Sequence, residues 1–197
     1  MKRRIAKMAA CGIVLSTVNL SAQNITLGAK AGYSLANLTD VEDVTQKGAF
    51  AGGGFVSLGL GNIFLAAEAL YAQRKVESGG VVALTQDFVE IPAMLGTRLA
   101  GGIFQPKLYV GATAAFESKC SVDNVTAALG VSDCASLDTK SAIWSATFGG
   151  GLDLNLGVIV LTTDVRYNLG LTKISGTSDA KWNTWMLLGG VAFRLGV

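Results

Sequence analysis

Histidine is absent from this chain of 197 residues, and its absence bears first on catalysis. A chain without histidine lacks the usual general base of Ser-His triads and Asp-His dyads. Two carboxylates, Glu68 and Glu90, remain as candidates for acid-base chemistry. We favour ion pairs between such carboxylates and inward-facing arginines, namely Arg74, Arg98 and Arg166, over a catalytic pair. The sequence therefore predicts a protein that is not an enzyme.

Basic residues are scarce once the N-terminus is set aside. Residues 1–22 hold four of the 16 lysines and arginines and none of the 14 acidic residues, which leaves 12 against 14 and a net charge of −2. Nucleic-acid binding needs lysine and arginine clustered on one surface, so no such partner is predicted. The glycine triplets at 52–54 and 149–151 precede neither a helix nor a Lys-Ser/Thr pair, and they are not phosphate loops. No cofactor is expected.

An apolar helix able to cross a membrane is missing as well. The best candidate, residues 50–67, is an uncharged run of 18 residues. Its glycines argue against a helix, because each weakens a helix by about 1 kcal/mol relative to alanine. The pair Gly61-Asn62 is typical of a tight turn. This region therefore predicts a β-hairpin.

The N-terminus has the organisation of a secretory signal peptide. Four basic residues precede the apolar run 8–15, and small and polar residues follow it. We place cleavage after Ala22, so that residues 1–22 are removed and residues 23–197 form one domain. Cys11 raises the alternative of a lipoprotein, but too little apolar sequence precedes it. The sequence predicts an exported protein.

Two cysteines, Cys120 and Cys134, remain in the mature chain. An even pair in an exported protein predicts a disulfide, and two free thiols are the alternative. Closing a loop of about 15 residues stabilises the fold by roughly 3 kcal/mol through loop-closure entropy. The acidic residues Asp40, Glu42 and Asp43 are interpreted as solvated loop charges in preference to a calcium site, so no metal is predicted.

Alternation of apolar with small or polar side chains, the two-residue period of a β-strand, recurs along most of the chain. Trp144, Phe148 and Leu152 share one face of such a segment, and Ser145 and Asp153 share the other. Eight alternating segments follow residue 24, in a chain with 25 glycines and two prolines. The predicted strands are residues 25–38, 48–60, 63–74, 86–99, 106–117, 141–154, 158–169 and 182–197.

The connections between these segments alternate in length. The second, fourth and sixth are short and rich in Gly or Asn, whereas the other four run from about 10 to 23 residues. Outer-membrane barrels combine short periplasmic turns with longer outward loops, and a soluble sandwich has no reason to do so. We predict an all-β, eight-stranded antiparallel up-and-down transmembrane β-barrel with both ends of the mature chain in the periplasm. The long connections are residues 38–47, 75–85, 118–140 and 170–181.

The placement of charge indicates which solvent meets the apolar face. Charged residues share a face with small ones, opposite bulky side chains such as Leu65, Val110 and Leu161. A lysine or arginine near the midplane of the lipid face costs about 2–4 kcal/mol, whereas charges inside a narrow barrel can pair. A soluble lipocalin-like barrel predicts the reverse arrangement. The charges predicted to face inward are Lys30, Glu68, Arg74, Glu90, Arg98, Lys107, Glu117, Asp153, Asp164, Arg166 and Arg194.

Aromatic residues lie near the strand ends that adjoin the long connections. Such a position predicts an aromatic girdle at a membrane interface. The alternative is that aromatic residues are simply common in strands. The six residues are Tyr33, Tyr71, Phe116, Trp144, Tyr167 and Trp185.

Several segments together resemble a known family. The segments are residues 28–34, 68–74, 88–92, 109–112 and 164–171, of which the Glu-Ile-Pro and Arg-Tyr-Asn-Leu-Gly-Leu elements are the more specific. They are similar to the PorT-like outer-membrane β-barrel family, a porin-family group, over essentially all of the mature chain. The resemblance implies an eight-stranded barrel in the outer membrane of a Gram-negative cell. It implies no general biochemical activity.

The sequence thus predicts an integral protein of the bacterial outer membrane. Eight strands leave an interior just filled by side chains, so we expect a structural or interaction role through external loops. A narrow channel or an accessory of transport or secretion is the first alternative. An enzyme acting on lipid or protein is a less favoured one. The expected partners are outer-membrane lipid, the barrel-assembly machinery during biogenesis, and an unidentified external ligand or protein.

Overall fold

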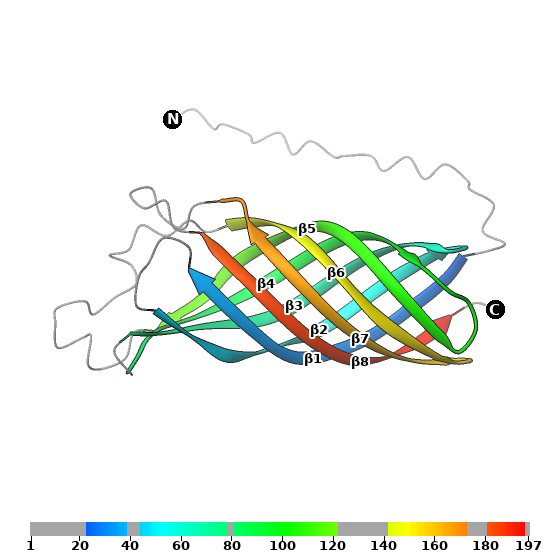
Figure 1. Cartoon of the computed structure of the whole chain (residues 1–197), viewed down its shortest axis with the longest axis horizontal. Helices are drawn as coiled ribbons and strands as arrows, with labels where there is room; N and C mark the ends of the chain where they lie inside the picture. Colours follow the sequence, from blue (N-terminus) through cyan, green and yellow to red (C-terminus); the bar gives the residue numbers. More distant parts are fainter. Residues whose placement is uncertain (1–22, 39–43, 79–80, 122–141, 173–180, 196–197) are drawn as a thin grey trace, which may run out of the picture.

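The protein folds as a closed barrel of eight antiparallel strands (Figure 1). The computed structural model describes residues 23–38, 44–78, 81–121, 142–172 and 181–195. Each strand pairs with the next along the chain, and β1 pairs with β8 to close the barrel. The predicted eight-stranded up-and-down barrel is confirmed. The strands are β1 Gln23–Leu38, β2 Val44–Leu60, β3 Ile63–Ser78, β4 Val81–Arg98, β5 Phe104–Ser121, β6 Ala142–Leu156, β7 Ile159–Gly170 and β8 Trp182–Leu195.

The two-residue alternation of the sequence is an alternation between the lumen and the outside. In β7, buried and exposed residues alternate at nearly every position. Leu161 and Val165 are 43% and 49% exposed, whereas Asp164 and Arg166, on the opposite face, are buried. The apolar side chains therefore cover the outside of the barrel, as they do where lipid is the solvent. No helix in the described part of the chain is long and apolar enough to cross a membrane.

Three tight turns lie at the end of the barrel where β1 begins and β8 ends. Gly61, Gly102 and Gly157 have φ angles of 63°, 95° and 87°, a region that side chains with a Cβ rarely adopt. Gly61 and Asn62 connect β2 to β3, as predicted. We call this the turn end and the opposite one the outer end.

The strands at the outer end are longer than the sequence predicts. Residues 75–85 were expected to form a long connection, but Ser78 pairs with Val81, which leaves only residues 79–80 between β3 and β4. Residues 44–47 likewise pair with residues 75–78. Hydropathy cannot reveal these extensions, because strand residues beyond the lipid have no need for an apolar face. Longer connections remain at 122–141 and 171–181.

The predicted girdle residues lie on the outside of the barrel towards the outer end. Tyr33, Trp144 and Trp185 are 69%, 53% and 53% exposed. The rings of Tyr167 and Trp185 pack together, with their centroids 4.8 Å apart. Tyrosine and tryptophan are favoured at membrane interfaces because their rings are apolar and carry one polar group.

Candidate functional site

The lumen of the barrel contains a connected network of charged side chains, and Glu68 lies at its centre. Arg166 donates two hydrogen bonds to this carboxylate, at 2.8 Å to Oε2 and 3.0 Å to Oε1. Lys30 Nζ donates to Glu68 Oε1 at 2.7 Å and to Asp164 Oδ2 at 2.7 Å. All four side chains are buried, so each charge depends on the others for solvation.

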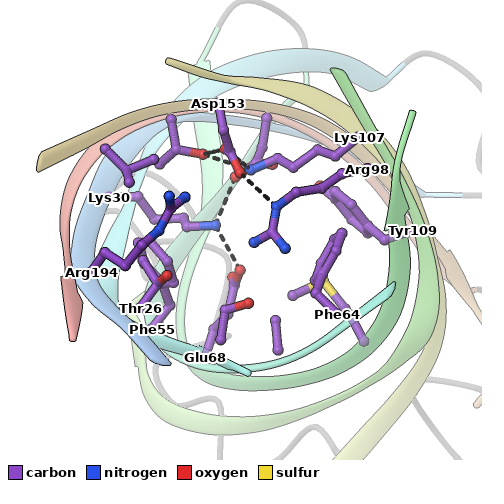
Figure 2. A pocket seen from close by; sticks show the side chains of 16 residues that line it. Thr26, Lys30, Phe55, Phe64, Glu68, Arg98, Lys107, Tyr109, Asp153 and Arg194 are labelled. Carbon is purple, nitrogen blue, oxygen red and sulfur yellow. Dashed lines mark hydrogen bonds and ion pairs between the residues drawn. The ribbon is translucent and has the colours of Figure 1, made fainter. Parts of the chain in front are cut away.

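The network continues from Asp164 towards the turn end through Lys107. Lys107 Nζ lies 3.1 Å from Asp164 Oδ1 and donates to Asp153 Oδ1 at 2.6 Å. Thr162 bridges the same pair, since its hydroxyl lies 2.6 Å from Lys107 Nζ and donates to Asp153 at 2.7 Å. Arg98 Nε lies 3.8 Å from the second oxygen of Asp153. Figure 2 shows these side chains converging on the lumen from opposite walls of the barrel.

A second charged cluster lies towards the outer end. Arg74 donates to Glu90 at 2.6 Å, and both side chains are almost completely buried. The Arg74 guanidinium also stacks 4.2 Å from the ring centroid of Phe88 and 5.6 Å from that of Trp182. These aromatic faces stabilise a cation that water does not reach.

An apolar cluster lies between Glu68 and Arg74 on the β3 and β8 side of the lumen. Leu70, Met186 and Leu188 pack together in the lumen and are each at most 2% exposed. Leu70 lies between Glu68 and Arg74 on β3, in the order that runs from the turn end to the outer end. A hydroxyl cluster lines other strands, where Thr147 bonds to Thr113 at 2.6 Å and to Asn168 at 2.9 Å. The lumen is therefore filled by side chains.

A small cavity remains on the turn-end side of the apolar cluster (Figure 2). Its volume is about 30 Å³, which holds about two water molecules. Charged groups of both signs line it, together with the rings of Phe55, Phe64 and Tyr109. Gly149 leaves room for Tyr109, because a Cβ at this position would lie 2.5 Å from the tyrosine ring.

The eleven charges predicted to face inward occupy different environments. Eight are buried, whereas Arg98, Glu117 and Arg194 are half-buried. Glu68 and Glu90, considered above as a carboxylate pair, are bound by different arginines, Arg166 and Arg74. No side-chain hydrogen bond or ion pair of Glu117 or Arg194 occurs in the described structure.

Sequence reasoning missed the neutral members of the lumen. Thr162 belongs to the ionic network, and Tyr109 and Phe64 form part of an apolar cluster next to it. Thr162 precedes Asp164 by two residues and so shares its face, a signal that the strand period contains. The predicted disulfide cannot be placed, since Cys134 and the side chain of Cys120 lie outside the described residues. The same holds for Asp40, Glu42 and Asp43, and no potential metal-binding group of three or more His, Cys, Asp or Glu residues occurs among those described.

A closed barrel that is apolar outside and ionic inside defines a membrane β-barrel protein. Residues 21–176 match the family described as "Outer membrane protein beta-barrel domain", and the chain belongs to this family. A search of the curated proteins gave no match.

Three solved structures share the fold at low sequence identity. Neisserial surface protein A is 15% identical with a TM-score of 0.56, and the alignment covers 87% of this chain and 97% of that protein. The outer membrane protein OprG from Pseudomonas aeruginosa is 14% identical with a TM-score of 0.58, covering 90% and 97%. Ail, the attachment invasion locus protein of Yersinia pestis, is 14% identical with a TM-score of 0.50, covering 88% and 97%.

Proposed function

We propose that this barrel is a closed scaffold in the outer membrane whose external connections bind a ligand or protein outside the cell. The observation that carries this proposal is a lumen filled with buried side chains, including the apolar cluster of Leu70, Met186 and Leu188. Ions do not cross a filled lumen without water, and the central charges are engaged in pairs, Lys30 with Glu68 and Arg74 with Glu90. A role in binding at the outer end therefore fits the molecule better than conduction.

Two of the similar structures bear names that are consistent with a role at the cell surface. One is a surface protein of Neisseria, and the other is named an attachment invasion locus protein. The connection between β5 and β6, residues 122–141, is the longest of this chain and the first candidate for a binding segment. A disulfide between Cys120 and Cys134 would tie the first part of that connection to β5.

The finer points of the proposal follow from the sequence. We propose that residues 1–22 are a cleaved signal peptide, that both ends of the mature barrel are periplasmic, and that the chain is similar to the PorT-like barrels. Its partners are then outer-membrane lipid and the barrel-assembly machinery, besides the external ligand. The proposed role is not enzymatic, because the chain has no histidine.

Conductance across a planar bilayer tests whether the lumen is closed. We expect the purified barrel to insert without conductance steps, because buried side chains fill the lumen. A variant in which two apolar residues of the lumen are made small and polar, L70S together with L188S, is expected to conduct small currents. This control shows that the assay detects an open lumen. Steady single-channel currents from the unmodified protein would refute the closed scaffold and favour the narrow channel.

Folding must be verified in the same preparations. A folded barrel resists unheated SDS, so the unboiled and boiled samples are expected to migrate differently on a gel. The protein is also expected in the outer-membrane fraction. Recovery as a soluble periplasmic protein would contradict the assignment of the apolar face to lipid.

A further inference from the structure

Arg98 and Arg194 carry positive charge at the turn end that the network does not neutralise. Asp153 is the carboxylate nearest to Arg98, at 3.8 Å, but it already binds Lys107 at 2.6 Å. The side chain of Arg194 has no ion pair or hydrogen bond in the described structure, and its buried Nε lacks a partner. The charged groups that line the inner cavity are four cations, Lys30, Arg98, Lys107 and Arg194, against three carboxylates, Glu68, Asp153 and Asp164.

The two arginines also line a second cavity, which opens at the turn end of the lumen. Its volume is about 110 Å³, room for roughly seven water molecules or one small oxyanion. Asn24, Asn62 and Gln105 line the same cavity, so uncharged hydrogen-bonding groups surround the two guanidinium groups. Figure 2 shows both arginine side chains projecting into the lumen. No carboxylate lines this cavity among the described residues.

The barrel anchors the backbone at both arginines. The backbone N–H of Arg98 donates to Asn62 O at 2.7 Å, and that of Arg194 donates to Val158 O at 2.8 Å, so neighbouring turns anchor both strands. Gly59 makes space for Arg98, since a Cβ there would lie 3.3 Å from its terminal nitrogen. The Arg98 guanidinium packs 5.0 Å from the ring centroid of Phe64, which leaves its N–H edge available.

We propose that Arg98 and Arg194 form a binding site for a phosphate-class oxyanion at the turn end of the lumen. Guanidinium groups present their N–H donors in a fork that matches two oxygens of a phosphate, and two such groups facing one small cavity select an anion. The anion compensates the charge of Arg98 and Arg194, as the carboxylates do deeper in the lumen. The site is independent of the proposed role of the external connections, which lie at the other end of the barrel.

Calorimetric titration of the purified barrel in a sugar-based detergent without phosphate groups tests the site. Inorganic phosphate is expected to bind with a dissociation constant on the order of 1 mM or below at low salt. R98Q and R194Q are each expected to weaken binding about tenfold, and the double variant to abolish it. K75Q is the matched control, because it removes one positive charge at the outer end and is expected to bind as the unmodified protein does. Each variant is checked for folding by its migration on an unboiled gel.

A parallel titration with glycerophosphoethanolamine, a soluble phosphodiester headgroup, distinguishes the two sources of the anion. Stronger binding of inorganic phosphate assigns the site to a free anion, whereas stronger binding of the diester assigns it to a lipid headgroup. The proposal is overturned if neither compound binds. It is equally overturned if the folded R98Q/R194Q variant binds phosphate as tightly as the unmodified barrel, or if K75Q loses binding to the same extent.

Discussion

Glu68 accepts three hydrogen bonds from two charged side chains in the interior of the barrel. It accepts hydrogen bonds from Arg166 and Lys30, which come from strands on opposite sides of it in the chain order, β7 and β1. Its own strand is β3, so one carboxylate links three strands across the lumen. A buried ion network of this kind adds little stability compared with apolar side chains of the same volume. Removing one member is nevertheless costly, because it leaves its partners as unpaired buried charges.

Replacement of Glu68 by glutamine is therefore expected to destabilise the barrel strongly. The change keeps the shape but leaves Lys30 and Arg166 without their shared anion, at a cost of about 3 kcal/mol in the free energy of unfolding. Urea unfolding of the barrel in lipid vesicles measures it. Glu117→Gln is the control, since the side chain of this half-buried carboxylate has no hydrogen bond or ion pair in the described structure. Its loss is expected to change stability by about 0.5 kcal/mol or less. Equal effects of the two substitutions would show that the network does not matter for stability.

At the scale of the elements, the seam between β1 and β8 closes the barrel. Its register pairs Gly32 of β1 with Leu188 of β8, and Ala31 with Gly189. The two glycines therefore lie in adjacent residue pairs, one on each strand. They differ in their surroundings. A Cβ on Gly32 would lie 1.9 Å from the backbone oxygen of Leu187, whereas a Cβ on Gly189 would meet nothing within 4 Å.

The two glycines give a matched pair of alanine substitutions. Gly32→Ala forces the backbones of β1 and β8 apart and is expected to cost about 2 kcal/mol or more, or to prevent folding. Gly189→Ala adds a methyl group on the open side and is expected to stay within about 0.5 kcal/mol of the unmodified protein. The fraction that resists unheated SDS during refolding measures both. A folded, fully stable Gly32→Ala barrel would mean that the seam is looser than described.

The element scale also shows what the sequence reveals and what it does not. The strand period reveals β7 almost residue by residue, because every inward residue there is buried and its neighbours meet lipid. The same period places Lys30, Glu68 and Asp164 on the inner face, yet it cannot tell that one lysine reaches both carboxylates. That contact depends on the closure of the barrel, which brings β1, β3 and β7 together. The extension of β3 to Ser78 was missed because its pairing with β4 continues beyond the apolar pattern.

The whole molecule has two different ends and a band of limited height between them. Outward-facing residues of β3 run from Ile63 near the turn to Tyr71 in the girdle. Eight steps of about 3.3 Å at a tilt of about 40° span roughly 20 Å, close to the apolar band of outer-membrane barrels. Tyr71 and the other Tyr and Trp residues of the girdle mark the outer boundary of this band. At the turn end, the strands stop soon after the last apolar residues. At the outer end, the strands continue past the girdle.

This asymmetry predicts the orientation of the barrel in the cell. Short turns face the periplasm in outer-membrane barrels, so residues 99–103 are expected in the periplasm and residues 122–141 at the cell surface. An epitope tag inserted between Gly130 and Val131 is expected to bind antibody on intact cells. The same tag between Ala100 and Gly101 serves as the control and is expected to bind only after the outer membrane is permeabilised. Both tagged proteins are checked for folding by their resistance to SDS. If the folded proteins show the reverse labelling, the barrel has the opposite orientation in the membrane. The oxyanion site of Arg98 and Arg194 would then lie at the cell surface.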